Sequence, residues 1–149
     1  MSVYAENRKA RHEYTTLESF EGGLALLGHE VKSIRSGGAN LTGAYLGFQK
    51  GELWLIGARI APYSKAGNRD GIDPERERKV LVRRQELQHL VGKIQEKGLT
   101  LVPFSLYPRG RHIKLSFGLC RGKKDYDKRA DLKRRALDRD VRRWKLEDT

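Results

Sequence analysis

The order of apolar and polar positions along the chain predicts a body of short strands. Residues 12–20, HEYTTLESF, combine β-branched and aromatic side chains without a helical period, which is typical of a strand. Gly22 and Gly23 then break or bulge the chain, and GLALLG (23–28) predicts a second strand. Residues 42–60 predict a hairpin around a turn at Lys50-Gly51, and residues 99–119 predict a final hairpin around Pro108-Arg109-Gly110.

Two other stretches repeat their apolar residues at helical spacing. In HEVKSIRSGG (29–38), Val31 and Ile34 are three residues apart and Gly37 supplies a C-terminal stop. Residues 83–98 carry a longer apolar stripe that ends at Gly98. The polar segment 62–79 contains two Pro and two Gly and predicts a long loop, a kind of segment that often carries function.

These elements add up to about six short strands with two to three helices and no internal repeat. The prediction is a mainly β fold, an OB-like closed antiparallel barrel, which is the commonest small barrel that binds nucleic acid. Pro103 cannot donate to a strand ladder, so its strand is expected to be bulged or to lie at an edge.

The last 28 residues differ from this body. We expect two regions, a barrel over residues 1–121 and a basic tail over residues 122–149. In the tail, Leu137, Val141 and Trp144 form a narrow stripe at helical spacing, and almost everything else is polar. Such a helix is marginal alone in water, so we expect a tail that is disordered in isolation and helical against a partner.

Charge narrows the class of partner. Lys and Arg number 31 against 19 Asp and Glu, a net charge of +12, which attracts nucleic acid, anionic membrane or acidic protein. Basic residues gather in three places in the body. Aromatic residues are sparse among them, which favours recognition of a folded RNA by shape over stacking on successive single-stranded bases. The clusters are Arg8, Lys9 and Arg11; Lys32 and Arg35; and Arg76, Arg78 and Lys79 with Arg83 and Arg84.

Other classes of protein find little support in the residues. One cysteine, Cys120, allows no intrachain disulfide, and neither a signal peptide nor a membrane-spanning run is recognisable, so we expect a cytoplasmic monomer without membrane contact. The four histidines lack metal-ligand spacing, and no P-loop or activated nucleophile is present. We therefore expect neither a metal, a cofactor nor an enzymatic activity.

Five segments, in order, resemble one known family. They are NRKARHEY (7–14), FEGGLALLGHEVKSIRSGGANL (20–41), DPERERKVL (73–81), Ser-Leu-Tyr (105–107) and GKKDYDKR (122–129). The chain is similar in these to small protein B, the SsrA-binding proteins of bacterial trans-translation. The resemblance implies an OB-fold barrel that binds the tRNA-like domain of transfer-messenger RNA (tmRNA) and delivers it to stalled ribosomes. It also implies elongation factor Tu on aminoacylated tmRNA as a further partner.

The resemblance places RNA contacts at Asn7, Glu21, Leu81 and Lys114, beside the first two basic clusters. Lys114 suits a phosphate. Glu21 cannot meet a phosphate directly, so it would accept from a base or orient a neighbouring Arg or Lys, and a structural salt bridge is an equal alternative. Leu81 would pack against a loop or base of the RNA, unless it is a core leucine of a strand.

In the tail, the resemblance implies a helix that enters the decoding centre and the empty mRNA channel beside 16S rRNA, with Gly122 as its hinge. The family often has His where this chain has Tyr126, so stacking on a base is retained and imidazole chemistry is not. A structural ribosomal protein or general RNA-binding protein with an rRNA-threading tail remains the alternative, and it would copurify with every ribosome. The expected ribosome-binding residues are Gly122, Lys123, Lys124, Tyr126, Asp127, Lys128, Arg129 and Trp144.

Overall fold

The computed structural model describes residues 3–63, 72–96 and 98–122, and these form nine strands and three helices. In chain order they are β1 (Ala5–Glu6), α1 (Arg8–Glu13), β2 (Tyr14–Leu24), α2 (Gly28–Arg35), β3 (Ala39–Asn40), β4 (Tyr45–Gln49), β5 (Glu52–Ile56), β6 (Arg59–Ile60), β7 (Arg78–Leu81), α3 (Arg84–Ile94), β8 (Leu99–Arg109) and β9 (His112–Gly122).

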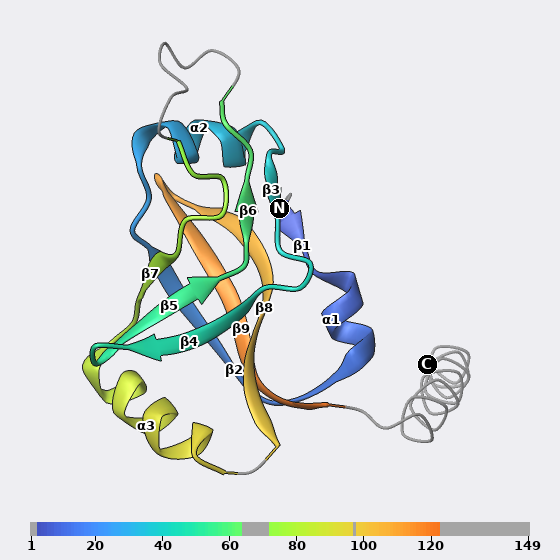
Figure 1. Cartoon of the computed structure of the whole chain (residues 1–149), viewed down its shortest axis with the longest axis vertical. Helices are drawn as coiled ribbons and strands as arrows, with labels where there is room; N and C mark the ends of the chain where they lie inside the picture. The colour runs from blue at the N-terminus through green and yellow to red at the C-terminus, as the bar shows by residue number, and fades with distance from the viewer. Residues whose placement is uncertain (1–2, 64–71, 97, 123–149) are drawn as a thin grey trace, which may run out of the picture.

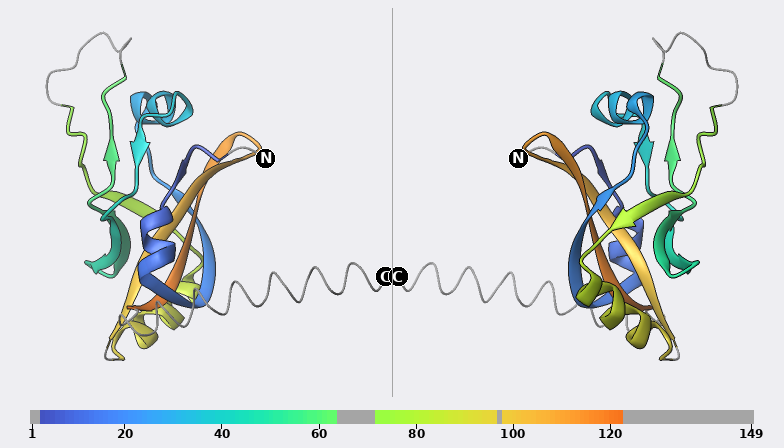
Figure 2. Two further views of the ribbon diagram at one scale, coloured as in Figure 1. Left: turned by 90° about the vertical axis from the view of Figure 1, so that its right-hand side faces the viewer. Right: turned by 90° about the vertical axis from the view of Figure 1, so that its left-hand side faces the viewer.

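Six of the strands form a closed ring. The hydrogen-bonded order is β8-β4-β5-β7-β2-β9, and β9 returns to pair with β8, all antiparallel. Strand β1 adds to β8, and β3 pairs with β6 in a small separate sheet. Figures 1 and 2 show α2 at one end of the ring and α3 at the other. This arrangement confirms the predicted mainly β, OB-like antiparallel fold with three helices.

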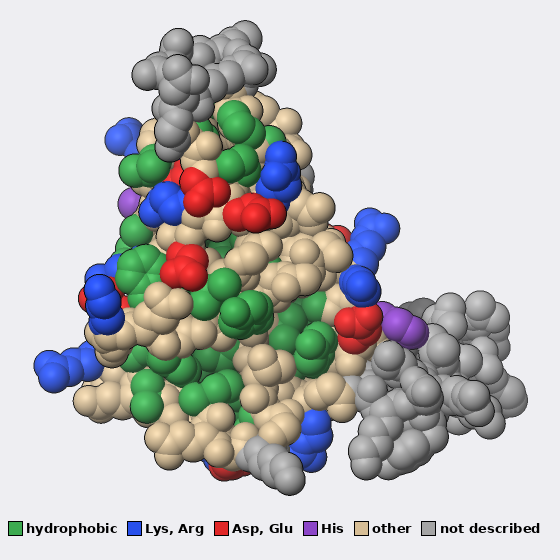
Figure 3. Space-filling view, in the orientation of Figure 1, with side chains coloured by type: hydrophobic (Ala, Val, Ile, Leu, Met, Phe, Trp, Pro, Cys, Tyr) green, Lys and Arg blue, Asp and Glu red, His purple; other side chains and the backbone are tan. Residues whose placement is uncertain are grey.

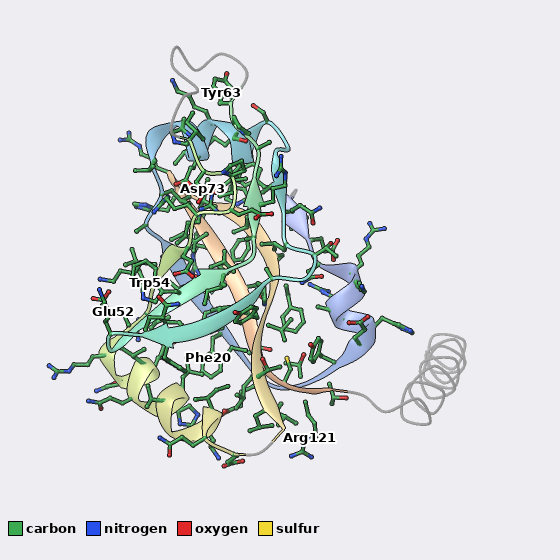
Figure 4. All side chains as sticks on the ribbon, in the orientation of Figure 1. Phe20, Glu52, Trp54, Tyr63, Asp73 and Arg121 are labelled. Atoms are coloured by element: carbon green, nitrogen blue, oxygen red, sulfur yellow. The ribbon has the colours of Figure 1, made fainter. Side chains whose placement is uncertain are left out.

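The inside of the ring is filled by the apolar positions of the alternating strands. Along β9, the side chains of Ile113, Leu115, Phe117 and Leu119 are all buried, whereas their neighbours at Lys114 and Ser116 are not fully buried. Phe20 of β2 stacks on Phe117 with ring centroids 5.6 Å apart, and Figure 4 shows its side chain among the strands. Removing this apolar surface from water is the main force that holds the ring together.

The start of the chain departs from the prediction. Residues 8–13 form α1, so the strand begins at Tyr14 instead of residue 12. The strand also continues without a break through Gly22 and Gly23 to Leu24, where two strands were predicted. Gly22 is required for close packing, because a Cβ there would lie 2.9 Å from Cγ1 of Val80 on β7. The glycine therefore permits strand pairing at this point.

The prediction of one long loop over residues 62–79 is also partly wrong. Its last residues belong to β7, which pairs with both β5 and β2 and completes the ring. The strand was missed because it has only four residues and carries charged side chains. Residues 64–71 of the predicted loop lie outside the described part of the chain.

Most other predicted elements are confirmed. Both hairpins form, although β8 and β9 are longer than predicted. Helix α2 ends at Arg35, two residues before Gly37, which has a φ of +86°, a value that favours glycine. Helix α3 forms as predicted but ends at Ile94, four residues before Gly98, so Gly98 is not its stop. The pairing of β8 with β9 shifts register between Pro103 and Ser105, which confirms the predicted bulge.

Candidate nucleic-acid interface

Two of the predicted RNA contacts lie in one row across three adjacent strands. Gly23 of β2 is paired with Lys114 of β9 on one side and with Leu81 of β7 on the other. Directly paired residues point to the same face of a sheet, and here it is the outer face. Because Gly23 has no side chain, the side chains of Leu81 and Lys114 approach each other over it: a Cβ there would lie 3.6 Å from Cδ1 of Leu81 and 3.8 Å from Nζ of Lys114. The fold thus joins residues that are 33 positions apart in the chain.

A groove of about 340 Å³ runs between this row and α2. We call it the outer groove, lined by Gly23, Leu24, Val31, Leu81, His112 and Lys114 among others. Leucine and valine side chains supply an apolar floor, and the cations of Lys114 and Arg111 border it. Such a surface offers van der Waals contact to a sugar or base edge and positive charge to the neighbouring phosphate.

Leu81 is an exposed leucine. Its exposed fraction is 49%, so the alternative that it is a core leucine of its strand is wrong. Inside the same strand, Val80 points into the core and is 3% exposed. An apolar side chain left on the surface beside a lysine is a fitting contact for a partner with mixed apolar and anionic character.

Glu21 lies on the same outer face as Gly23, two residues earlier in β2. Nη1 of Arg109 donates to one carboxylate oxygen of Glu21 at 2.5 Å, and the hydroxyl group of Tyr107 donates to the other. The hydrogen bond from Tyr107 lowers the pKa of Glu21, and the hydrogen bond and charge of Arg109 lower it further. Burial has the opposite effect but is outweighed. Burial and the bond to Glu21 raise the pKa of Tyr107 to about 12, so Tyr107 stays protonated near neutral pH.

Neither Tyr107 nor Arg109 was singled out as a site residue from the sequence. Tyr107 is directly paired with Lys114, so it belongs to the same row of the outer face. The only sequence signal was the Ser-Leu-Tyr stretch that ends at Tyr107. Residues 86 and 88 positions away from Glu21 could not be identified as its partners before the pairing of β9 with both β2 and β8 was known.

Asn7, the fourth predicted RNA contact, is 2% exposed. Its side-chain oxygen caps α1 by accepting from the amide of Ala10 at 3.2 Å. Its side-chain nitrogen donates to the carbonyl oxygens of Leu41 at 3.2 Å and Pro103 at 3.0 Å. Every polar group of this side chain is occupied, so in this structure Asn7 holds α1 on the barrel and presents nothing to a ligand.

The cluster on α1 is exposed but partly neutralised. Glu6 lies 3.7 Å from both Arg8 and Arg11, and Lys9 lies 3.9 Å from Glu13. Nothing from α1 lines the outer groove, so this cluster forms a separate surface.

The cluster on α2 is closer to the groove. Arg35 donates to the carbonyl oxygen of Arg111 at 3.2 Å, which fastens the turn between β8 and β9 to α2. Lys32 lies 6.0 Å from the centre of the Tyr63 ring. In the view of Figure 3, Lys and Arg side chains lie mostly at the margin of the face, with Asp and Glu nearer its middle.

The third basic cluster is not a free surface, and this prediction is wrong for its central residues. Arg78 is fully buried and lies 2.7 Å from Glu30, and it also donates to the carbonyl oxygens of Ala58 and Pro74. Arg76 reaches the same carboxylate at 2.5 Å. These arginines bind α2 and β7 together, because a buried charge is tolerated only when it is paired and hydrogen-bonded.

The predicted tail contacts from Lys123 to Trp144 lie outside the described residues. Gly122, the expected hinge, is the last residue of β9 and is paired with Tyr14. In the described ranges, no three His, Cys, Asp or Glu residues are grouped as metal ligands would be. None of the helices described here combines the length and the apolar character that crossing a membrane requires.

Comparison with known proteins identifies the family of this chain. The family model described as SmpB protein matches residues 4–147. An SsrA-binding protein of Roseiflexus sp. (strain RS-1) is 48% identical over 99% of this chain and 93% of its own length. An SsrA-binding protein of Gloeobacter violaceus is 50% identical over 95% of this chain and 92% of its own.

A solved structure described as "tmRNA-SmpB: a journey to the center of the bacterial ribosome" superposes with a TM-score of 0.66. It is 46% identical, and the match covers 83% of this chain and 90% of that one. With a family match over nearly the whole length and relatives close to half identical, this chain belongs to the SmpB family of SsrA-binding proteins.

Proposed function

We propose that this chain is a tmRNA-binding protein of trans-translation. It binds the tRNA-like domain of tmRNA and delivers it to stalled ribosomes. The observation that carries the proposal is the convergence of Glu21, Leu81 and Lys114 on one outer face, in a chain whose relatives are SsrA-binding proteins. The resemblance to the family places RNA contacts at each of these three positions.

The chemistry of the outer groove suits a folded RNA. Lys114 supplies a positive charge for a backbone phosphate, whose neutralisation releases condensed counterions. Leu81 and the apolar floor fit the flat surfaces of a base or ribose, which are presented by loops and helix ends of structured RNA. The groove combines apolar side chains with the cations of Lys114 and Arg111, a chemistry that suits backbone phosphates and flat surfaces more than a base sequence, so we expect recognition to depend on the shape of the RNA.

The tail has a separate task in this proposal. Residues 122–149 enter the decoding centre and the empty mRNA channel, where Tyr126 and the Asp127-Lys128-Arg129 run meet 16S rRNA. The support is the resemblance of GKKDYDKR to the family and a family match that extends to residue 147. A tail with so few apolar residues has little to bury, and rRNA phosphates would stabilise its helix in place of a core.

The proposal makes the protein a binding factor, not an enzyme. It acts in the cytoplasm, where the ribosome is, and it shares aminoacylated tmRNA with elongation factor Tu. Asn7 is left out of the direct contacts because its polar groups are used inside the barrel. We explain its place among the RNA-contacting positions of the family by its role in holding α1 on the barrel.

The test is equilibrium binding of the full chain to a transcript of the tRNA-like domain at several salt concentrations. Lys114→Gln should weaken binding and make the slope of log K against log salt shallower by about 0.7–0.9, the loss of one phosphate contact. Lys93→Gln is the matched control, because Lys93 is a surface lysine in the last turn of α3. Equal effects of the two substitutions would mean that Lys114 contributes only general charge, and absence of binding by the unaltered chain would overturn the proposed function.

A further inference from the structure

The carboxylate of Glu21 lies on the outer face, which binds a polyanion under the proposed function. The presence of a negative charge there needs a physical explanation. A free carboxylate there would repel phosphates. Both of its oxygens are instead occupied, one by Arg109 and the other by Tyr107. Its negative charge is therefore paired with the positive charge of Arg109, although the Glu21 side chain is 36% exposed.

Arg109 has the properties of a residue held ready for a ligand. Its side chain is 66% exposed, and it stands at the end of β8, directly before the turn into β9. A guanidinium has five N–H donors, and Glu21 is the one side chain among the described residues that is bonded to this one. The remaining donors face solvent and match the geometry of a phosphate, which arginine binds through two parallel hydrogen bonds.

The turn that carries Arg109 is fastened from both sides. Glu21 holds it from β2, and Arg35 of α2 donates to the carbonyl oxygen of Arg111 at 3.2 Å. Tyr107 fixes the carboxylate, and its own backbone is paired with Lys114 of the outer groove. An exposed arginine otherwise loses much of its side-chain conformational freedom when it binds. Holding it in place beforehand removes part of that cost.

We propose that Arg109 is a further RNA-contacting residue of the outer face, and that Glu21 and Tyr107 are positioning residues that act through it. The proposal rests on the proposed function and deepens it. One role expected of Glu21 was to orient a neighbouring Arg or Lys, and Arg109 is the residue that it orients in this proposal. The ligand group is a phosphate of the RNA backbone next to the part that contacts Lys114 and Leu81.

The proposal makes a prediction opposite to that of simple electrostatics. Removing a negative charge from a polyanion-binding face should tighten binding if Glu21 only repels. Under the proposal, Glu21→Gln weakens binding, because Arg109 loses its orientation. The double variant Glu21→Gln/Arg109→Gln should bind no more weakly than Arg109→Gln alone, because Glu21 has nothing left to position.

The experiment measures binding of these full-length variants to the tRNA-like-domain transcript across a salt series. Arg109→Gln should weaken binding by about tenfold, the effect of one charge-assisted hydrogen bond, and make the salt slope shallower by about 0.7–0.9. Arg109→Lys should restore the slope but not the full affinity, since an ammonium group has no bidentate fork. Tyr107→Phe should weaken binding less than Arg109→Gln and should add nothing in the Glu21→Gln background.

The matched control is Arg121→Gln. Arg121 is exposed and is paired with Leu99 at the opposite end of the β8–β9 hairpin, and Figure 4 shows it at the end of the barrel away from Tyr63 and α2. It should leave the affinity for this transcript nearly unchanged. The variants of Glu21, Arg109 and Arg121 should nearly keep the unfolding midpoint of the unaltered chain, because these side chains are exposed, and the midpoint of Tyr107→Phe should be measured alongside because Tyr107 is half-buried.

Three results would overturn the proposal. They are tighter binding by Glu21→Gln, an unchanged salt slope in Arg109→Gln, and additive losses in the double variant, which would mean that Glu21 contacts the RNA itself. If the unaltered chain and the Arg121 control bind the transcript normally, any of these results refutes the positioning role alone. Failure of the unaltered chain to bind would instead refute the proposed function.

Discussion

Asn7→Ala provides the sharpest test of the difference between a residue that binds RNA and one that builds the surface. The substitution removes the cap of α1, a loss of about 1 kcal/mol. It also removes the hydrogen bonds to the carbonyl oxygens of Leu41 and Pro103, each worth about 0.5–1.5 kcal/mol net. The carbonyl oxygen of Leu41 keeps a second donor, the amide of Ala44 at 3.0 Å, so losing its hydrogen bond from Asn7 should cost an amount at the low end of that range. The expected total is about 2–3 kcal/mol of unfolding free energy.

The assay is urea unfolding followed by far-ultraviolet circular dichroism. With a urea dependence of about 2 kcal/mol per molar, the expected loss lowers the midpoint by about 1–1.5 M. Asn40→Ala is the matched control. Asn40 is exposed, and its side chain accepts only from the nearby amide of Thr42 at 2.9 Å. Its loss should stay below about 1 kcal/mol.

RNA binding distinguishes a structural role of Asn7 from a direct contact with the RNA. Under conditions where the Asn7→Ala chain is still folded, the salt slope for the tRNA-like-domain transcript should be unchanged, because no charge has left the outer groove. Suppose instead that the urea midpoint equals that of the Asn40→Ala control while affinity falls. Asn7 would then reach the RNA directly, and the assignment of its side chain to the barrel would be refuted.

Three further predictions concern the buried carboxylate and the tail. Glu30→Gln should cost about 3–5 kcal/mol in urea unfolding, because it leaves a buried arginine charge without its partner. Burial works to raise the pKa of Glu30, but its hydrogen bonds outweigh burial and lower it, so its stabilisation is present above the unfolded carboxyl pKa of about 4.3. This stabilisation should be lost as pH falls through the lower pKa that Glu30 has in the folded chain. If the stability of the unaltered chain and that of Glu30→Gln changed identically with pH, the stabilising role of the Glu30 carboxylate would be refuted. Changing Asp127, Lys128 and Arg129 together to Ala should leave tmRNA binding intact and abolish peptide tagging in a purified translation system; normal tagging would refute the role proposed for the tail. Tyr126→Ala should impair tagging and Tyr126→His should restore much of it, whereas equal defects in both would show that ring stacking is not what matters.

Local sequence determined the elements whose signals come from near neighbours. Alternation of apolar residues predicted the two hairpins, and Gly37 marked the end of α2 because a left-handed φ is accessible to glycine at little cost. Pro103 predicted a bulge because it lacks a backbone donor. The short β7 escaped detection because a four-residue charged strand has no periodicity long enough to recognise.

Only the tertiary structure decided which charged and polar residues are available to a partner. Arg78 and Asn7 are both polar, and both are buried because the fold supplies partners from distant parts of the chain, such as the carbonyl oxygens of Ala58 and Leu41. Leu81 is apolar and exposed for the opposite reason, since its place in β7 turns it to the outer face. Burial and pairing across a closed sheet depend on contacts between residues far apart in the chain. The sequence therefore identifies the family and those elements that have a local signal, while ring closure brings Glu21 to Arg109 and Leu81 beside Lys114.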